Sequence, residues 1–209
     1  MDEYVSLKPS EIPQGRAFTD PRHNAEDLAA LRVMAARVRG VVTDPSALPD
    51  GPRPLVVETL EASGRRHRTV LCDAGRLRAG RDLAFVGFFA LKRRDVDPSP
   101  LTVVDDELIG EFPRHPGILS YSSLELHDGN WANLILVDPP EAKDHWRESA
   151  RHAYAAQELA PRHYAVVRLH NGVFPGGLLG GRDAVLVRTK YYDFRGAAPW
   201  QAERALHPA

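Results

Sequence analysis

The strongest constraint on the fold is the order of structural patterns between residues 83 and 194. Residues 83–91 (LAFVGFFAL) are apolar at every position, which is typical of a central strand covered on both faces. Later, the turn His127-Asp128-Gly129-Asn130 has Asp-Gly at its centre and favours a β-hairpin. The sequence predicts strands at 83–91, 117–126, 131–137 and 183–194, and helices at 102–112 and 141–158. This is the order β-α-β-β-α-β of a ferredoxin-like layout.

One segment of this region fits two interpretations. Residues 161–170 contain the β-prone run VVRL, yet Tyr164, Val167 and His170 recur at helical spacing. On this spacing we predict a second helical piece that begins at Pro161 and extends towards His170.

The first 80 residues have a different character. Residues 1–23 are rich in Pro, Gly and charge, and Leu28, Leu31, Ala35 and Val38 then recur at helical spacing. Ser63-Gly64 separates two strand-like runs and indicates a hairpin. We therefore expect an extension of arm, helix and β-hairpin over 1–80, packed on a main domain over 81–195, with a C-terminal tail over 196–209.

Composition limits the partners and the compartment. The formal net charge of −1 gives no overall field to attract nucleic acid, and no stretch is long and apolar enough to span a membrane. Cys72 is the single cysteine, which rules out an intrachain disulfide and a cysteine-based zinc site. The N-terminus lacks the basic start and apolar run of a signal peptide, so we expect a cytoplasmic protein.

The segment that reads PGILSYSSLELHDGNWANL, then DPPEAKDHW and RESARHAY, resembles the dimeric α+β barrel superfamily, and within it the antibiotic-biosynthesis and haem-degrading monooxygenases. The likeness covers residues 82–194. It implies a ferredoxin-like unit whose open sheet face pairs with a second protomer, so a homodimer is expected. It also implies a small-molecule site between sheet and helices, and either haem or no cofactor.

The histidines are the residues best suited to chemistry. His145 and His152 are seven residues apart, and His163 and His170 repeat this spacing. Two helical turns span about 10 Å, which is too far for one pair to bind one metal ion. A single imidazole can nevertheless ligate haem iron or act as a general base. The resemblance points to His152 as the haem ligand, with His163 or His170 as alternates.

These observations give two classes of function. The first is a haem-dependent or cofactor-free, monooxygenase-like oxidoreductase acting on a small, natural-product-like molecule, with His152, His145 and His163 as catalytic candidates. In the haem version Arg168 or Arg188 would hold the propionates. The second class is a non-catalytic small-ligand or haem-binding protein, and a cofactor-free isomerase or cyclase with a His base is a further alternative. Side chains able to line a site for a flat ligand are Trp131, Trp146, Phe88, Phe89 and Tyr164.

Three consecutive acids also stand out. Asp105, Asp106 and Glu107 follow Thr102, a possible helix cap, and suit either a metal ion or the positive end of a helix dipole. We favour the dipole interpretation.

Overall fold

The structure is a computed structural model that describes residues 4–44 and 54–206. Its strands are β1 (Val5–Ser6), β2 (Leu55–Leu60), β3 (Arg66–Leu71), β4 (Leu83–Lys92), β5 (Ile118–Glu125), β6 (Trp131–Val137), β7 (Tyr164–Phe174), β8 (Val185–Asp193) and β9 (Trp200–Ala205). Its helices are η1 (Ala17–Thr19), α1 (His23–Thr43), α2 (Ala74–Arg78), α3 (Ser99–Glu111), η3 (Phe112–Arg114), α4 (Ala142–Arg147), α5 (Ala150–Tyr154), η4 (Ala155–Leu159) and α6 (Ala160–His163).

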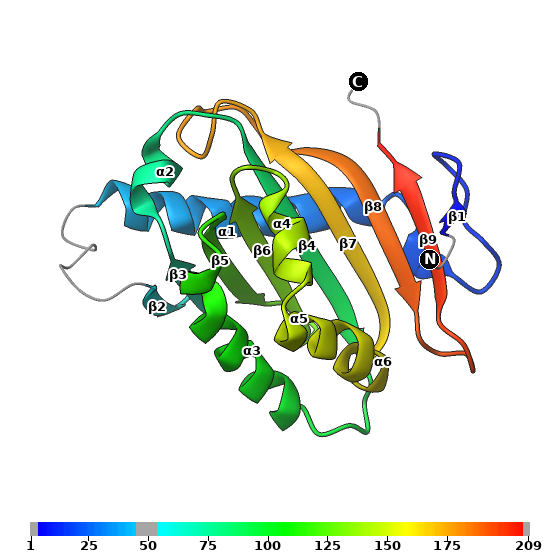
Figure 1. The fold of residues 1–209 in the computed structure, drawn as a ribbon. Helices are drawn as coiled ribbons and strands as arrows, with labels where there is room; N and C mark the ends of the chain where they lie inside the picture. The colour runs from blue at the N-terminus through cyan, green and yellow to red at the C-terminus, as the bar shows by residue number, and fades with distance from the viewer. Residues whose placement is uncertain (1–3, 45–53, 207–209) are drawn as a thin grey trace.

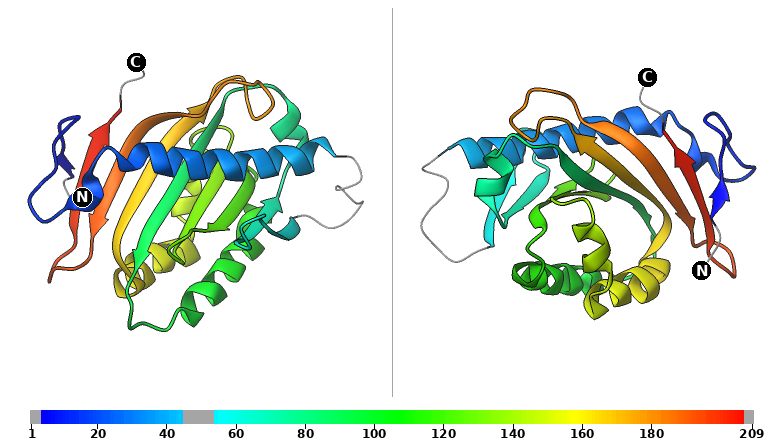
Figure 2. Two further views of the ribbon diagram at one scale, coloured as in Figure 1. Left: turned by 180° about the vertical axis from the view of Figure 1, so that it is seen from behind. Right: turned by 45° about the horizontal axis from the view of Figure 1, so that its top comes forward.

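All nine strands form one sheet, in the order β1-β9-β8-β7-β4-β6-β5-β3-β2. Neighbouring strands are antiparallel, except that β1 and β9 are parallel. Helix α1 crosses one face of the sheet, whereas α3, α4, α5 and α6 lie on the other (Figure 1 and Figure 2). The prediction of a mixed α+β fold is confirmed.

The central strands follow the chain order β4-α3-β5-β6-helices-β7, and they lie side by side as β7-β4-β6-β5. The predicted order β-α-β-β-α-β is therefore present. Its last strand is β7, however, and the prediction of a helix up to His170 is wrong beyond His163. Strand β7 pairs with β4 on one side and β8 on the other, and this pairing outweighs the helical spacing of its apolar residues.

Strands outside this unit widen the sheet on both edges. The hairpin predicted in the N-terminal part is present as β2 and β3, and it extends the sheet at the β5 edge, while β8, β9 and β1 join the β7 edge. Part of the expected C-terminal tail is thus β9, while residues 207–209 lie outside the described residues.

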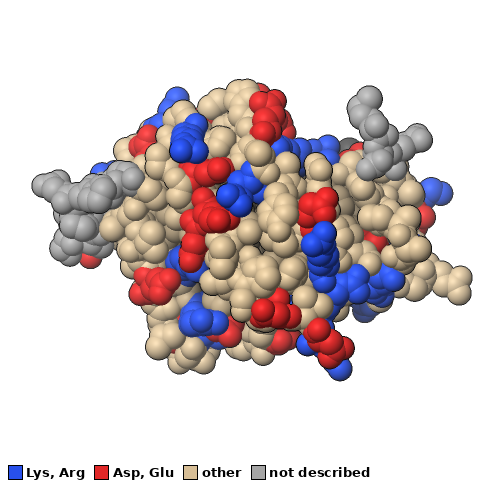
Figure 3. Space-filling model, turned by 60° about the horizontal axis from the view of Figure 1, so that its bottom comes forward, with Lys and Arg blue, Asp and Glu red and all other residues tan. Residues whose placement is uncertain are grey.

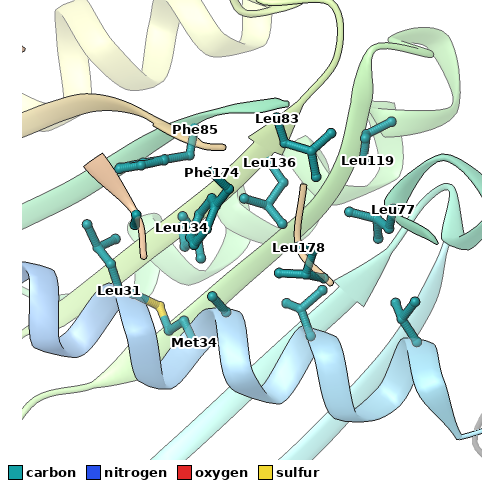
Figure 4. Packing of buried hydrophobic residues seen from close by; sticks show 14 of the residues in the cluster. Leu31, Met34, Leu77, Leu83, Phe85, Leu119, Leu134, Leu136, Phe174 and Leu178 are labelled. Atoms are coloured by element: carbon teal, nitrogen blue, oxygen red, sulfur yellow. The ribbon is translucent and has the colours of Figure 1, made fainter. Parts of the chain in front are cut away.

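Helix α1 covers the sheet face that was expected to meet a second protomer. Leu31, Met34, Ala35, Val38 and Val42 are buried against the sheet, in a core shared with side chains of β4 and β6 (Figure 4). They follow the 3.6-residue period of a helix, which confirms the helix predicted here. The homodimer was expected because this face of the sheet would otherwise be exposed. Since α1 covers the face, that reason no longer holds.

The helices on the opposite face enclose a second core. It consists of the buried residues Val70, Ile109, Phe112, Ile118, Tyr121, Ile135, Val137, Ala142 and Trp146. Helix α3 begins at Ser99, before the expected cap Thr102, because the Asp97 carboxylate accepts hydrogen bonds from the Ser99 N–H (3.0 Å) and hydroxyl (2.7 Å). Asp105, Asp106 and Glu107 consequently lie beyond the first turn of α3, so the dipole interpretation is wrong for all three.

No helix among residues 4–44 and 54–206 is both long enough and apolar enough to cross a membrane.

Candidate functional site

Strand alternation sorts the candidate residues onto the two faces of the sheet. Successive side chains of a strand point to opposite faces. In β7, Arg168 and His170 contact α1, so Asn171 points away from α1. In β6, Ala132 and Leu134 belong to the core under α1, so Asn133 between them also points away. We call the surface opposite α1, which carries α3 to α6, the helical-side face.

The face under α1 holds a buried ionic group. Asp27 of α1 accepts hydrogen bonds from Arg168 Nε (2.6 Å) and Nη2 (2.7 Å), and its Oδ2 lies 2.8 Å from His170 Nε2. His170 Nδ1 lies 2.8 Å from the Thr189 hydroxyl. Burial alone would raise the pKa of Asp27, but the hydrogen bonds from His170 and Arg168 outweigh burial and lower it. His170 and Thr189 are fully buried, so this group holds α1 on the sheet.

A second histidine lies under α1 in a similar setting. His67 Nδ1 lies 2.7 Å from Glu61 Oε1, and His67 Nε2 lies 3.2 Å from the Ser122 hydroxyl. Burial lowers the pKa of His67. The order Ser-His-carboxylate is that of a nucleophilic triad. Ser122, however, is fully buried in the middle of β5 and contacts Thr69 at 3.3 Å, so these contacts satisfy buried polar groups.

His152 and Trp146 meet on the helical side. Their ring centroids are 4.7 Å apart. Burial lowers the pKa of His152 to about 4, and the charges of Arg147 and His115 act in the same direction. The Ser149 hydroxyl accepts a hydrogen bond from the His152 N–H and so begins α5. His152 is therefore a neutral imidazole at pH 7 and a weak proton acceptor.

Four of the six buried side-chain polar atoms that lack hydrogen-bond partners among the described residues lie on the same side of the sheet. They are Asn133 Oδ1, Asn171 Oδ1 and Nδ2, and Trp146 Nε1. Asn133 lies opposite Phe88 of β4, and Asn171 lies opposite Val86 of β4. Buried polar groups are nearly always hydrogen-bonded in folded proteins, so these atoms call for partners other than the protein's own side chains, either ordered water or a ligand.

Acidic and phenolic groups border this region. The Tyr121 hydroxyl donates a hydrogen bond of 2.6 Å to Asp105. Burial raises the pKa of Asp105, although Tyr121 and Arg68 oppose the change. Tyr164 packs edge-on against Phe88 at 5.5 Å, and burial together with the charge of Asp105 raises its pKa to about 12. Asp105 is thus a half-buried carboxyl group, 26% exposed and 3.2 Å from Arg68 Nη1, whose pKa is nevertheless raised.

The remaining candidates lie apart from this region. His145 is exposed, and His163 is buried with its Nδ1 2.9 Å from the Leu159 carbonyl oxygen. Trp131 lies at the start of β6 beneath the side chains of Arg66 and Lys92. Arg188 of β8 points to the helical side and lies 3.6 Å from Glu203.

The sequence-predicted haem residues do not converge. His152 and Trp146 lie on the helical side, whereas His170 and Arg168 lie under α1 and are occupied by Asp27. Haem at His152 would have no propionate partner in Arg168, because the sheet separates the two. Arg188 shares the helical side with His152 but lies 3.6 Å from Glu203, so the candidate haem residues are divided between the two faces of the sheet, and Arg168 and His170 cannot serve a haem at His152. Within the described part of the chain, no three His, Cys, Asp or Glu side chains cluster to hold a metal ion.

Comparison with known proteins adds little. No family model matches this chain, and no curated protein does. Among solved structures, protein SO0527 from Shewanella oneidensis aligns over 46% of this chain and 94% of its own, with 15% identity and a TM-score of 0.38. A similarity of this size supports no conclusion about function.

Three residues of the site were missed from the sequence. Asn133 is a lone polar residue in the apolar run of β6, which was a signal in the sequence, whereas Asn171 follows Arg168 and His170 in β7 and carried no such signal. Asp105 was recognised as an acid but assigned to a helix end. Its spacing from Ile109, four residues along one face of α3, was the available signal that it faces the sheet.

Proposed function

We propose that this protein binds a small, flat organic molecule on the helical-side face, beside Trp146, Asn133 and Asn171. The observation that carries the proposal is the set of buried amide and indole atoms without partners. Leaving such a group unpaired costs about 1–3 kcal/mol, so a chain that keeps several of them gains when a ligand supplies the missing hydrogen bonds.

The surroundings favour a ligand with an apolar body. Phe88 and Tyr164 form an edge-on aromatic pair, and Trp146 and Val86 belong to the neighbouring apolar core. Ligand sites of this kind combine aromatic walls with a few placed polar groups. Positive and negative side chains alternate over the surface in Figure 3, which offers no one-sign patch to a polyanion.

The fold also favours a ligand site on the helical-side face. The order β7-β4-β6-β5 with helices on one face is consistent with a ferredoxin-like unit of the dimeric α+β barrel type, in which α1 takes the place of a second protomer. In such a unit the ligand lies between the sheet and its helices, on the side of His152.

Binding is tested by titrating the protein with 2-naphthol, a flat probe with one hydroxyl group, and following heat by calorimetry. We expect saturable binding that weakens several-fold in Asn171→Leu, because the ligand loses a hydrogen-bond partner. Asn24→Leu, on α1, is the matched control and should bind like the wild type. If the wild type, Asn171→Leu and Asn24→Leu bind 2-naphthol with equal affinity, the proposed location of the ligand site is contradicted.

A second candidate is catalysis of proton transfer without a cofactor, as in a cofactor-free oxygenase or isomerase. The observation that favours it is Asp105, whose pKa is raised by burial and which accepts a hydrogen bond from Tyr121. A carboxyl group in an apolar setting is a stronger base than one in water. Because the lowered pKa of His152 makes it a weak base, we propose that His152 contacts the ligand and does not remove a proton.

This candidate is tested with 5-nitrobenzisoxazole. A base removes its C3 proton while the N–O bond breaks, which yields coloured 2-cyano-4-nitrophenolate. We expect catalysis above the rate with acetate in solution, lost in Asp105→Asn and kept in Asp106→Asn, whose side chain is 65% exposed. A rate no higher than that of acetate would contradict the base role.

A further inference from the structure

A cavity lies at the end of the sheet where β8 turns into β9. It has a volume of about 370 Å³ and lies between this turn and the N-terminal segment around Gly15. Figure 1 shows β8 and β9 beside that segment. Arg16, Asp193, Arg195 and Trp200 supply its walls. The volume is at the lower end of the range for small-molecule sites.

Arg16 has one guanidinium N–H group, at Nε, without a hydrogen-bond partner. Its guanidinium lies over the Trp200 ring, 4.2 Å from the centroid, so stacking fixes its plane. Its Nε is buried and has no hydrogen-bond partner. The nearest carboxylate oxygen, Asp193 Oδ2, is 3.5 Å away, beyond a strong hydrogen bond.

The second arginine, by contrast, is satisfied. Arg195 donates from Nε to Asp193 Oδ1 (2.8 Å) and from Nη2 to Asp193 Oδ2 (2.7 Å). Its Nη2 also donates to the Gly15 carbonyl oxygen at 3.0 Å. The hydrogen bond from Arg195 holds the pKa of Asp193 below its ordinary value. Asp193 is shared by Arg195 and, at 3.5 Å, by Arg16, so the two arginines and one carboxylate leave one net positive charge among the lining residues.

From these contacts we infer that the cavity is a binding site for a small molecule bearing one oxyanion group, a carboxylate or a phosphate, anchored by Arg16. A stacked guanidinium presents a planar fork of N–H donors, which matches the two oxygens of such a group. The bound oxyanion would complete the hydrogen bonding of Nε and balance the single positive charge.

This site is separate from the helical-side face. Tyr192 follows Arg188 and Lys190 on the helical side of β8, so Asp193 points to the α1 side. Trp200 is paired with Asp193 across the β8–β9 ladder and shares its side. A failure to detect binding at Arg16 would therefore not contradict ligand binding beside Trp146, and the reverse also holds.

The test is NMR titration with sodium phosphate and, separately, with sodium benzoate, at constant ionic strength set with sodium chloride. We expect saturable shifts of the Arg16 Nε–H and Trp200 indole N–H signals with one of the anions. The stronger-binding anion identifies the oxyanion class. The Trp146 indole signal should stay unchanged, which separates this site from the first.

Variants make the test specific. Arg16→Ala should weaken binding at least tenfold. Arg16→Lys, which keeps the charge but loses the fork, should weaken it less. Arg182→Ala removes an arginine that is 66% exposed and should bind normally. The inference is overturned if neither anion gives saturable shifts in the wild type, or if a folded Arg16→Lys or Arg16→Ala protein binds like the wild type.

Discussion

Arg168 and Asp27 form a two-pronged ion pair, with Nε–Oδ2 and Nη2–Oδ1 distances of 2.6 and 2.7 Å. It joins β7 to α1 across 141 residues of sequence and, together with His170, fixes the helix over the sheet. This ion pair explains why Arg168 and His170, which the sequence suggested as cofactor-binding residues, have a structural role in this fold.

Removing the carboxylate should destabilise the protein strongly. In Asp27→Ala, Arg168 and His170 lose their partner while they remain largely buried, and breaking a buried pair costs about 3–5 kcal/mol. Urea unfolding followed by circular dichroism measures the change. Glu26→Ala, at an 83% exposed position one residue earlier, should leave the free energy of unfolding nearly unchanged. Equal stability of Asp27→Ala and the wild type would contradict the role of the pair.

Acid should weaken the fold through His152. Its pKa is about 4 in the folded protein and about 6.5 when unfolded, so the unfolded chain binds more protons as the pH falls below 6.5. Stability is then lost as the pH falls, by up to about 2 kcal/mol between pH 6.5 and pH 5. The difference between wild type and His152→Phe in urea unfolding at pH 7 and pH 5 isolates this effect. An identical pH dependence in both proteins would show that His152 titrates normally.

Two glycines should respond to alanine in opposite directions. A Cβ at Gly172 would lie 2.3 Å from both the Phe85 ring and the Val185 carbonyl oxygen. Gly172→Ala should therefore destabilise by about 1–3 kcal/mol. Gly40 lies in α1 with nothing within 4 Å of its Cβ position, and Gly40→Ala should stabilise by about 0.5–1 kcal/mol. Thermal unfolding of the two variants checks both signs.

The protein should sediment as a monomer. Helix α1 covers the sheet face that a second protomer covers in a dimeric barrel. Sedimentation equilibrium at micromolar concentration should give a mass near 23.2 kDa. Twice that mass would restore the dimer expected from the resemblance and would require an interface elsewhere.

Helices and hairpins whose residues lie close together in the sequence were predicted correctly. The helical period of Leu31, Ala35 and Val38 gave α1, and the Asp128-Gly129 turn gave the hairpin of β5 and β6. Strand β7 was mispredicted because its identity depends on ten residues of pairing with β4, and pairing is set by residues distant in sequence.

The site was harder to predict for the same reason. The contact of His152 with Trp146 follows from nearby helical positions. In contrast, the separation of His170 from His152 depends on which face of β7 meets α1. A register change of one residue would exchange the two faces, and no local pattern reports it.

The most direct test of the proposed site uses the indole N–H signals of the three tryptophans, which lie in three different places. Trp131 is at the β5–β6 hairpin, Trp146 on the helical side and Trp200 in the cavity at Arg16. On titration with 2-naphthol, we predict saturable shifts of the Trp146 indole and of the Asn133 and Asn171 side-chain amides, with Trp131 and Trp200 unchanged. If the Trp146, Asn133 and Asn171 signals stay in place while the probe binds elsewhere or not at all, the helical-side face is not the ligand site.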